Sequence, residues 1–281
     1  MTTTGSNGAA VDPVSLHPAL EDAAVAARRA LADAVTRFDR ADLAETVRPG
    51  ADGTPTMRID DLVEAAILDA VAPHRVNVLS EEAGFVDVGS AVTLVIDPLD
   101  GSANAAAGVP LSCFTGAIAV DGEVRQALTV WLETGRRWAA RHDEPVPWCT
   151  SGRTALDGAA VSLLRPHARN RDTWWRVTER AQRVRILSCS ALESVLVAVG
   201  ATDAFADAGS DTHRLVDLVA ALVLVPPAGG AVVDARGRPI EIHPDLTRRY
   251  SGVVAATPAL AEALCEAITG SERSERTRVI R

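Results

Sequence analysis

Two carboxylates, a main-chain carbonyl and a hydroxyl are brought close together by the stretch VIDPLDGSAN, residues 95–104. Hard divalent cations such as Mg²⁺ prefer oxygen ligands of these kinds. Gly101 and Ser102 suit the start of a helix, where unpaired backbone N–H groups and the positive end of the helix dipole favour a phosphate. The stretch therefore predicts a site for metal ions and a phosphate. The alternative is an ordinary loop, since Asp, Pro and Gly are common turn residues.

Two further acidic segments favour the metal site over the ordinary loop. Upstream, the apolar segment 77–80 runs into Glu81 and Glu82. Downstream, Asp217 precedes an apolar segment that ends in the sequence PPAGG, residues 226–230. Acidic residues that lie far apart in sequence, each at the end of an expected element, are the usual components of a folded metal site.

The same segments resemble the inositol monophosphatase and fructose-1,6-bisphosphatase superfamily. The resemblance rests on NVLSEEAG, DPLDGSAN, RVRILSCSALE and an Asp thirteen residues before the second Gly of the AGG turn, and it covers about residues 53–268. It is closest to the archaeal and bacterial type that acts on both substrates. It implies an α/β (α+β) fold, the layered α-β-α-β-α sandwich. It also implies a magnesium-dependent, lithium-sensitive phosphatase and a homodimer.

The resemblance also assigns two or three Mg²⁺ ions to particular residues. The first ion would be held by Glu81, Asp97 and the carbonyl of Leu99. The second would be held by Asp97, Asp100 and Asp217. Asp60, at an expected helix start, would hold a third and weaker ion. Glu81 and Asp60 are also candidate catalytic groups, Glu81 as a base for the attacking water.

Phosphate and substrate would be held by other side chains. We expect the N–H groups of Gly101 and Ser102 to bind phosphate and the Ser102 hydroxyl to orient a water; direct attack by Ser102 is disfavoured because no base partner is visible. The resemblance places Asn104, Ser190 and Asp207 near the substrate hydroxyls; for Asp207 the alternative is a solvated strand end. The candidates for a second anionic group of the substrate are Arg165, His167 and Arg214, although most surface arginines bind nothing in particular.

Several positions depart from the family pattern and leave the substrate open. Ala105 to Ala107 stand where relatives usually carry an aromatic residue, and should enlarge that wall of the pocket. Val216 and Pro227 replace a usual Trp and Glu, and residues 141–148 lack the usual glycine-rich turn. A specialised sugar or cyclitol phosphate is the favoured substrate. The alternatives are a nucleotide 3′-phosphatase, disfavoured by the DGSANA turn, and an inactive binding partner, disfavoured by the complete set of metal-binding carboxylates.

Composition excludes several other functions. The chain has 281 residues and a formal net charge of −9, which argues against nucleic-acid binding. Apart from histidines all its basic residues are Arg, so mechanisms that need a lysine are excluded. No segment approaches the roughly 20 apolar residues of a membrane span. Residues 1–10 lack a signal-peptide pattern, so we expect a cytoplasmic protein. The four cysteines form no C-x-x-C pair, and we expect reduced thiols and no zinc.

Hydrophobic periodicity predicts the elements that position these residues. We expect helices over 13–40 and 60–72, a loop over 47–56, a strand over 93–96 that ends before Pro98, and an antiparallel meander over 115–120, 124–132 and 137–141. Later strands are expected at 159–164, 185–188, 204–207 and 231–234, with helices at 171–182, 192–199, 214–225 and 259–267. The domain prediction is a leader (1–12), an α+β half (13–156), an α/β half (157–270) and a tail (271–281).

Overall fold

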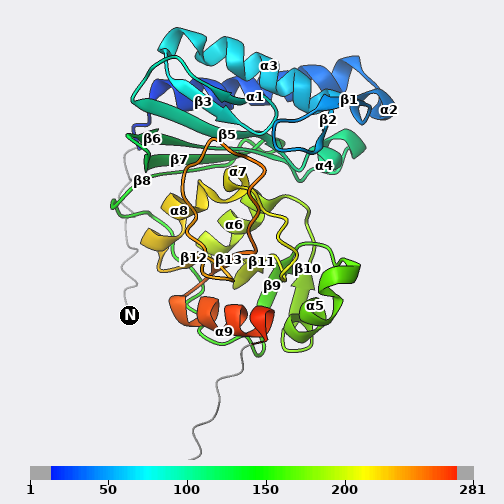
Figure 1. Ribbon diagram of the computed structural model, residues 1–281, viewed down its shortest axis with the longest axis vertical. Coiled ribbons are helices and arrows are strands. Elements are labelled where there is room, and N and C mark those ends of the chain that lie inside the picture. Colours follow the sequence, from blue (N-terminus) through cyan, green and yellow to red (C-terminus); the bar gives the residue numbers. More distant parts are fainter. Residues whose placement is uncertain (1–13, 271–281) are drawn as a thin grey trace, which may run out of the picture.

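The computed structural model of the chain describes residues 14–270 and has five layers. Figure 1 shows two helices over a six-stranded sheet, a middle layer of short helices, a five-stranded sheet, and two helices on its outer side. The expected α-β-α-β-α sandwich is therefore confirmed. The predicted leader and tail, residues 1–12 and 271–281, lie outside the described residues.

The six-stranded sheet carries the first two acidic segments. Its strand order is β4-β3-β5-β6-β7-β8, with β3 parallel to β5 and all other pairs antiparallel. The strands are β3 (Asn77–Ser80), β4 (Gly84–Val86), β5 (Val92–Asp100), β6 (Cys113–Val120), β7 (Glu123–Trp131) and β8 (Arg137–Arg141). The expected meander is thus confirmed, whereas β4 was not predicted.

Strand β5 does not end before Pro98, and this prediction was wrong. The strand continues to Asp100, because its pairing with β6 resumes there after an irregularity between Asp97 and Asp100. A bulge tolerates a residue that has no N–H group to donate to the ladder. Pairing with β3 stops at Ile96, so Pro98 lies where no second ladder requires its donor. The irregular end of the strand turns the two carboxylates out of the regular ladder.

Helices α1 (Pro18–Arg37) and α3 (Arg58–Val71) cover the outer face of this sheet. Their apolar residues form one buried cluster with the sheet, including Leu20, Ile59, Ile67 and Ile96. The helix expected over 13–40 begins at Pro18, a favourable first helical residue, and ends at Arg37; a separate short helix, α2 (Arg40–Leu43), follows it. This packing fixes α3, whose first turn carries Asp60.

The five-stranded sheet has the order β10-β9-β11-β13-β12. Its strands are β9 (Ala160–Leu163), β10 (Arg183–Arg185), β11 (Ala204–Ala206), β12 (Ala231–Asp234) and β13 (Gly252–Ala255). Helices α5 (Arg171–Thr178) and α9 (Pro258–Thr269) cover its outer side. β10 lies earlier in the chain than expected, α5 is shorter, and β13 was not predicted. We propose the two halves, residues 13–156 and 157–270, as structural units because each contains one of the two larger sheets.

The middle layer lies between the two sheets and carries the third acidic segment. It contains α6 (Ser190–Ala198), α7 (Leu215–Leu218) and α8 (Ala221–Leu224). One helix was expected over 214–225; the structure has two short ones, followed by a 3₁₀ turn, Pro226–Ala228. All of Leu215, Val216, Asp217 and Leu218 are buried, because α7 packs between the layers.

The segment expected as a loop over 47–56 instead contains a small hairpin. Strands β1 (Thr46–Pro49) and β2 (Pro55–Met57) pair antiparallel, and the turn between them carries Asp52. The short helix α4 (Ser102–Ala107) follows β5 directly. Within residues 14–270 no helix is both long and apolar enough to span a bilayer.

Candidate metal centre

Three aspartates from distant parts of the chain meet at the inner face of the six-stranded sheet. Asp97 and Asp100 come from the end of β5 and Asp217 from α7; one carboxylate oxygen of each lies within 4.8 Å of the others. All three residues are buried. The structure thus brings together two of the three predicted acidic segments, and the oxygens are close enough to share cations.

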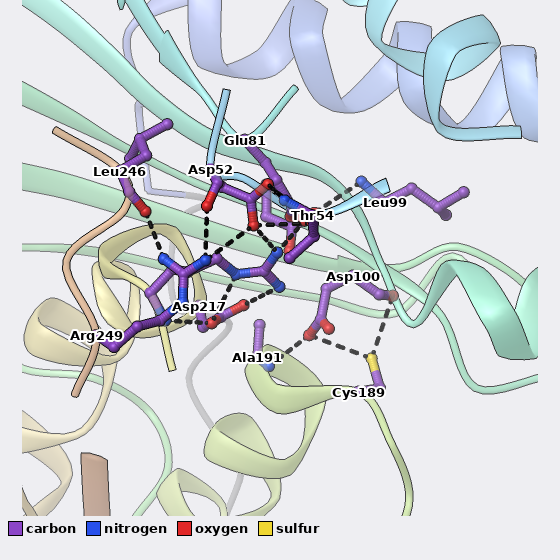
Figure 2. A network of polar contacts seen from close by, with 12 residues as sticks. Asp52, Thr54, Glu81, Leu99, Asp100, Cys189, Ala191, Asp217, Leu246 and Arg249 are labelled. Atoms are coloured by element: carbon purple, nitrogen blue, oxygen red, sulfur yellow. Dashed lines mark hydrogen bonds and ion pairs between the residues drawn. The ribbon is translucent and has the colours of Figure 1, made fainter. Parts of the chain in front are cut away.

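The local backbone orients Asp97 and Asp100. Asp97 Oδ1 accepts the Leu99 N–H at 3.0 Å, while Asp97 Oδ2 is buried and has no hydrogen-bond partner. Asp100 Oδ2 accepts the Ala191 N–H at 2.6 Å and the thiol of Cys189 at 3.5 Å. Figure 2 shows Asp100, Ala191 and Cys189 in this arrangement. One oxygen of each carboxylate is thereby fixed, which leaves the other for a ligand.

Glu81 joins the same site through Arg214. The Arg214 Nη1 atom donates to Glu81 Oε1 and, at 2.8 Å, to Asp52 Oδ2. The same guanidinium donates to both oxygens of Asp217 at 3.2 Å. Arg214 was predicted to bind an anionic group of the substrate; here its side chain lies among the carboxylates that were predicted to bind metal.

Asp52 and Arg249 belong to this network and were not predicted. The Asp52 side chain is fully buried and lies 3.5 Å from Arg249 Nη2, which also donates to the Asp52 carbonyl at 2.6 Å. Figure 2 shows Asp52, Glu81 and Asp217 pointing toward one another, with Arg249 behind them. The only sequence signal for Asp52 was a D-G turn, which is equally typical of an ordinary hairpin.

Burial and like charge disfavour ionisation of most of these acids. Burial, followed by Asp217, raises the pKa of Asp100 to about 6. Burial, against the attraction of Arg214, raises the pKa of Glu81 to about 8. Burial, Glu81 and Asp100 hold the pKa of Asp97 well above its ordinary value. Asp217 differs: burial opposes its ionisation, but Arg214 holds its pKa below the usual range. A cluster with such opposed shifts marks a functional site.

These residues fit hard divalent cations. The donor set is all oxygen, the buried Asp97 Oδ2 has no other partner, and the carboxylates carry more negative charge than Arg214 neutralises. A bound cation reverses the local electrostatics and favours the ionised acids. Among residues 14–270, Cys113 and Cys189 lie close to Asp100, with their sulfurs 3.5 Å apart. Both thiols are buried, and burial raises the pKa of Cys113 to about 11.

Asp60, Gly101 and Ser102 lie beside the carboxylate cluster. Asp60, in the first turn of α3, accepts the Met57 N–H at 3.0 Å, and the nearby Ser102 side chain favours its ionised form. Burial and the charge of Glu82 raise the pKa of Asp60 to about 7. Gly101 precedes α4 with φ of 83°, and a Cβ there would lie 2.6 Å from the Leu111 carbonyl. Glycine is therefore required where the chain turns from Asp100 to Ser102.

Asn104 is engaged by the protein backbone. Its Nδ2 donates to the carbonyls of Leu111 and Leu187 at 2.9 and 2.8 Å, which ties α4 to the turn before α6. Ala105 and Ala106 point into the core cluster with α1 and α3. Residues 105 and 106 are thus part of the hydrophobic core, and the expectation that residues 105–107 enlarge one wall of the substrate pocket stays a prediction.

The remaining predicted substrate residues lie in different surroundings. Ser190 is the first residue of α6 and precedes Ala191, so it lies beside Asp100. Asp207 is fully buried; its oxygens accept Ser210 N–H and Thr212 N–H, both at 2.7 Å. The alternative of a solvated strand end is therefore wrong, because Asp207 is buried and the loop after β11 donates to both of its oxygens; a contact with the substrate hydroxyls stays a prediction. Arg165 is exposed after β9, and no partner is found for it among residues 14–270.

Comparison with known proteins agrees with this fold. Residues 14–273 match the inositol monophosphatase family, and the chain belongs to that family. The chain is 32% identical over 244 residues to the fructose-1,6-bisphosphatase/inositol-1-monophosphatase of Thermococcus kodakarensis, which covers 80% of this chain and 87% of that protein. The family resemblance drawn from the motifs is thereby confirmed.

Two further similarities concern a longer protein and a solved structure. The chain is 29% identical over 239 residues to a bifunctional NADP phosphatase/NAD kinase of Methanococcus maripaludis, covering 74% of this chain and 42% of that protein. The structure of a Pyrococcus horikoshii protein with similarities to inositol-1 monophosphatase superposes with a TM-score of 0.72 at 26% identity, covering 89% of this chain and 96% of that one.

Proposed function

We propose that this protein is a Mg²⁺-dependent phosphomonoesterase that hydrolyses a small sugar or cyclitol phosphate. The observation that carries the proposal is the convergence of Asp97, Asp100 and Asp217 within 4.8 Å, with one oxygen of Asp97 lacking any partner. Membership of the inositol monophosphatase family and the names of the relatives support the same reaction class.

The proposal assigns the metal-binding residues as follows. Glu81, Asp97 and the Leu99 carbonyl would hold one Mg²⁺; Asp97, Asp100 and Asp217 would hold a second, and Asp60 contributes to a third. Bound ions of this kind lower the pKa of water and neutralise charge on the leaving oxygen. The protein contributes the fixed geometry: the bulge at the end of β5 and the Ala191 N–H hold the aspartates in place.

The phosphate would lie against the start of α4. There the first N–H groups of a helix have no intrahelical partner and can bind an anion, which assigns Gly101 and Ser102 to a phosphate oxygen. The Ser102 side chain lies near Asp60, whose raised pKa suits it to exchange a proton near neutral pH. Together Ser102 and Asp60 can orient a water and hold its proton. The proposal uses water as the nucleophile, because bound Mg²⁺ ions would lower the pKa of a water that they hold.

The alcohol of the substrate would be selected on the side of α6. Ser190 lies next to Asp100 there, and Arg165 is an exposed cation available to a second anionic group. Asn104 supports this region by holding the 187–188 backbone and acts as a positioning residue. The relatives are named for inositol phosphate, fructose bisphosphate and NADP, so these three define the substrate classes to test.

The experiment is a phosphate-release assay on purified full-length protein with Mg²⁺ or with EDTA. The panel contains inositol 1-phosphate, fructose 1,6-bisphosphate, NADP and adenosine 3′,5′-bisphosphate. We expect Mg²⁺-dependent release from a sugar or cyclitol phosphate, inhibition by lithium, and loss of release in Asp217→Asn but not in the exposed control Asp87→Asn. Faster release from a nucleotide would favour the alternative substrate class. No release from any substrate would overturn the proposed enzyme and favour a binding partner.

Two more properties belong to the same proposal. We propose a homodimer, which light scattering coupled to size-exclusion chromatography tests directly. We also propose a cytoplasmic location, which fractionation of cells that produce the protein tests.

A further inference from the structure

Arg214 occupies the centre of the candidate metal site. Its guanidinium contacts Glu81 Oε1 and both oxygens of Asp217, and these two residues are proposed metal ligands. Its side chain is 20% exposed, so the contacts are shielded from bulk water. The lone pairs that bind Arg214 are the ones that a metal ion would need.

The backbone of Arg214 is fixed, and one of the acids that its side chain contacts has a second cationic neighbour. Arg214 N–H donates to Asp217 Oδ2 at 2.6 Å as the cap of α7, which holds the main chain in place. Asp52, the third acid that Arg214 contacts, has a second cation in Arg249, 3.5 Å away. Asp52 therefore keeps a cationic neighbour when the Arg214 side chain leaves, whereas Glu81 and Asp217 would exchange their cation for a metal ion.

An arginine is an obligate cation, because its guanidinium does not lose its proton in proteins. Without it, the carboxylates of Glu81, Asp97, Asp100 and Asp217 would repel one another in a buried space. With it, an incoming divalent cation must both displace the guanidinium and overcome its charge. The same contacts therefore stabilise the metal-free fold and oppose metal binding.

Resting on the proposed metal site, we propose that Arg214 is the resident counter-cation of the metal-free protein and that Mg²⁺ binds by displacing its guanidinium from Glu81 and Asp217. Arg214 then lowers the affinity for Mg²⁺ and sets the concentration at which the site fills. It is a positioning residue for the ligand carboxylates before the metal arrives.

Arg214→Gln is compared with the native protein and with Arg238→Gln by isothermal titration with Mg²⁺ alone, after dialysis against EDTA. Arg238 is the matched control, since it also pairs with a buried carboxylate, Asp234, away from the site. In Arg214→Gln we expect a dissociation constant for Mg²⁺ that is lower by roughly tenfold or more, because a competing charge is removed from a site of low dielectric. We expect Arg238→Gln to bind Mg²⁺ as the native protein does.

Thermal unfolding of the same proteins supplies a second measurement. Metal-free Arg214→Gln should melt below the native protein and gain more on addition of Mg²⁺. If that variant does not fold without metal, Arg214→Lys replaces it: a single ammonium cannot contact Asp52, Glu81 and Asp217 together, so Mg²⁺ should again bind more tightly than in the native protein.

The outcomes separate this inference from the proposed function. Tighter Mg²⁺ binding by the Arg214 variants supports it. Native-like or weaker binding by those variants, with Mg²⁺ still bound by the native protein, overturns the inference and leaves the metal site standing. Absence of Mg²⁺ binding by native and variant proteins alike overturns both.

Discussion

Replacing Asp97 by Asn should abolish activity and stabilise the metal-free protein. Asp97 is 2% exposed, its Oδ2 has no partner, and Glu81 and Asp100 repel its charge. An amide of the same shape can keep its oxygen toward the Leu99 N–H and direct its NH₂ group toward the neighbouring carboxylates. The substitution therefore puts a neutral amide in place of a buried acid whose ionisation is disfavoured, and places a hydrogen-bond donor where Oδ2 has no partner.

The size of the effect follows from the cost of a buried unsatisfied polar group. Relief of that cost is worth about 2 kcal/mol in a folded protein. For a chain of this size, about 2 kcal/mol corresponds to a rise of roughly 4–8 °C in melting temperature. Bound Mg²⁺ should reverse the order, because a ligand at a hundred times its dissociation constant adds about 2.7 kcal/mol to the native protein and little to the variant.

The assay is thermal unfolding in EDTA and in Mg²⁺, together with phosphate release on the most active substrate of the panel. Asp234→Asn is the control, since both oxygens of that buried carboxylate accept hydrogen bonds from Arg238. We expect the control to melt at a lower temperature in both buffers and to stay active. A metal-free Asp97→Asn protein that melts at or below the native temperature, or that retains native turnover, would refute the reasoning.

Three further predictions follow from the site and its surroundings. Burial holds the folded pKa of Asp100 at about 6, of Asp60 at about 7 and of Glu81 at about 8, all above their unfolded values. The folded state therefore binds protons more tightly than the unfolded state, and this stabilisation is present at low pH and lost as pH rises through those values. The melting temperature of the metal-free protein should fall from about pH 5 to about pH 9, and Mg²⁺ should reduce this fall. A metal-free melting temperature that does not change with pH would contradict the prediction. Ser102→Ala should lower kcat about a hundredfold and Ser102→Thr should retain it, measured by steady-state kinetics; equal rates in both variants would remove Ser102 from the mechanism. Asp207→Asn should lower the free energy of unfolding by about 1–3 kcal/mol, measured in denaturant; an unchanged free energy of unfolding would contradict this, and a raised KM would support Asp207 as a substrate contact.

The sequence by itself determined the acidic segments and the layers that hold them. Periodicity of two over 115–141 predicted the meander, because alternation of apolar residues is a local property of a strand with one buried face. The positions of Asp97, Asp100 and Asp217 relative to apolar segments identified them as ends of elements. Side-chain chemistry then predicted oxygen ligands for a hard cation without any knowledge of distances.

Local signals failed where contacts between distant segments decided the backbone. Pro98 should end a strand by its own geometry, yet pairing of β5 with β6 resumes at Asp100 beyond the bulge. The segment 47–56 contains turn residues, but its ends pair as β1 and β2. The apolar segment 214–225 forms two short helices, α7 and α8, where it packs between the two sheets in the middle layer.

Only the tertiary structure decided what the charged residues do. Arg214 and Arg165 are the same residue type, but Arg214 pairs with three carboxylates, whereas Arg165 is exposed with no partner in residues 14–270. Asp207 and Asp97 both follow apolar segments, but the 208–212 loop donates hydrogen bonds to both oxygens of Asp207, whereas Asp97 Oδ2 has no partner. Charge, hydrogen-bond partners and burial depend on neighbours that lie far away in the chain. The chemistry of the site was therefore readable from residue types, whereas the role of each charge was set by packing.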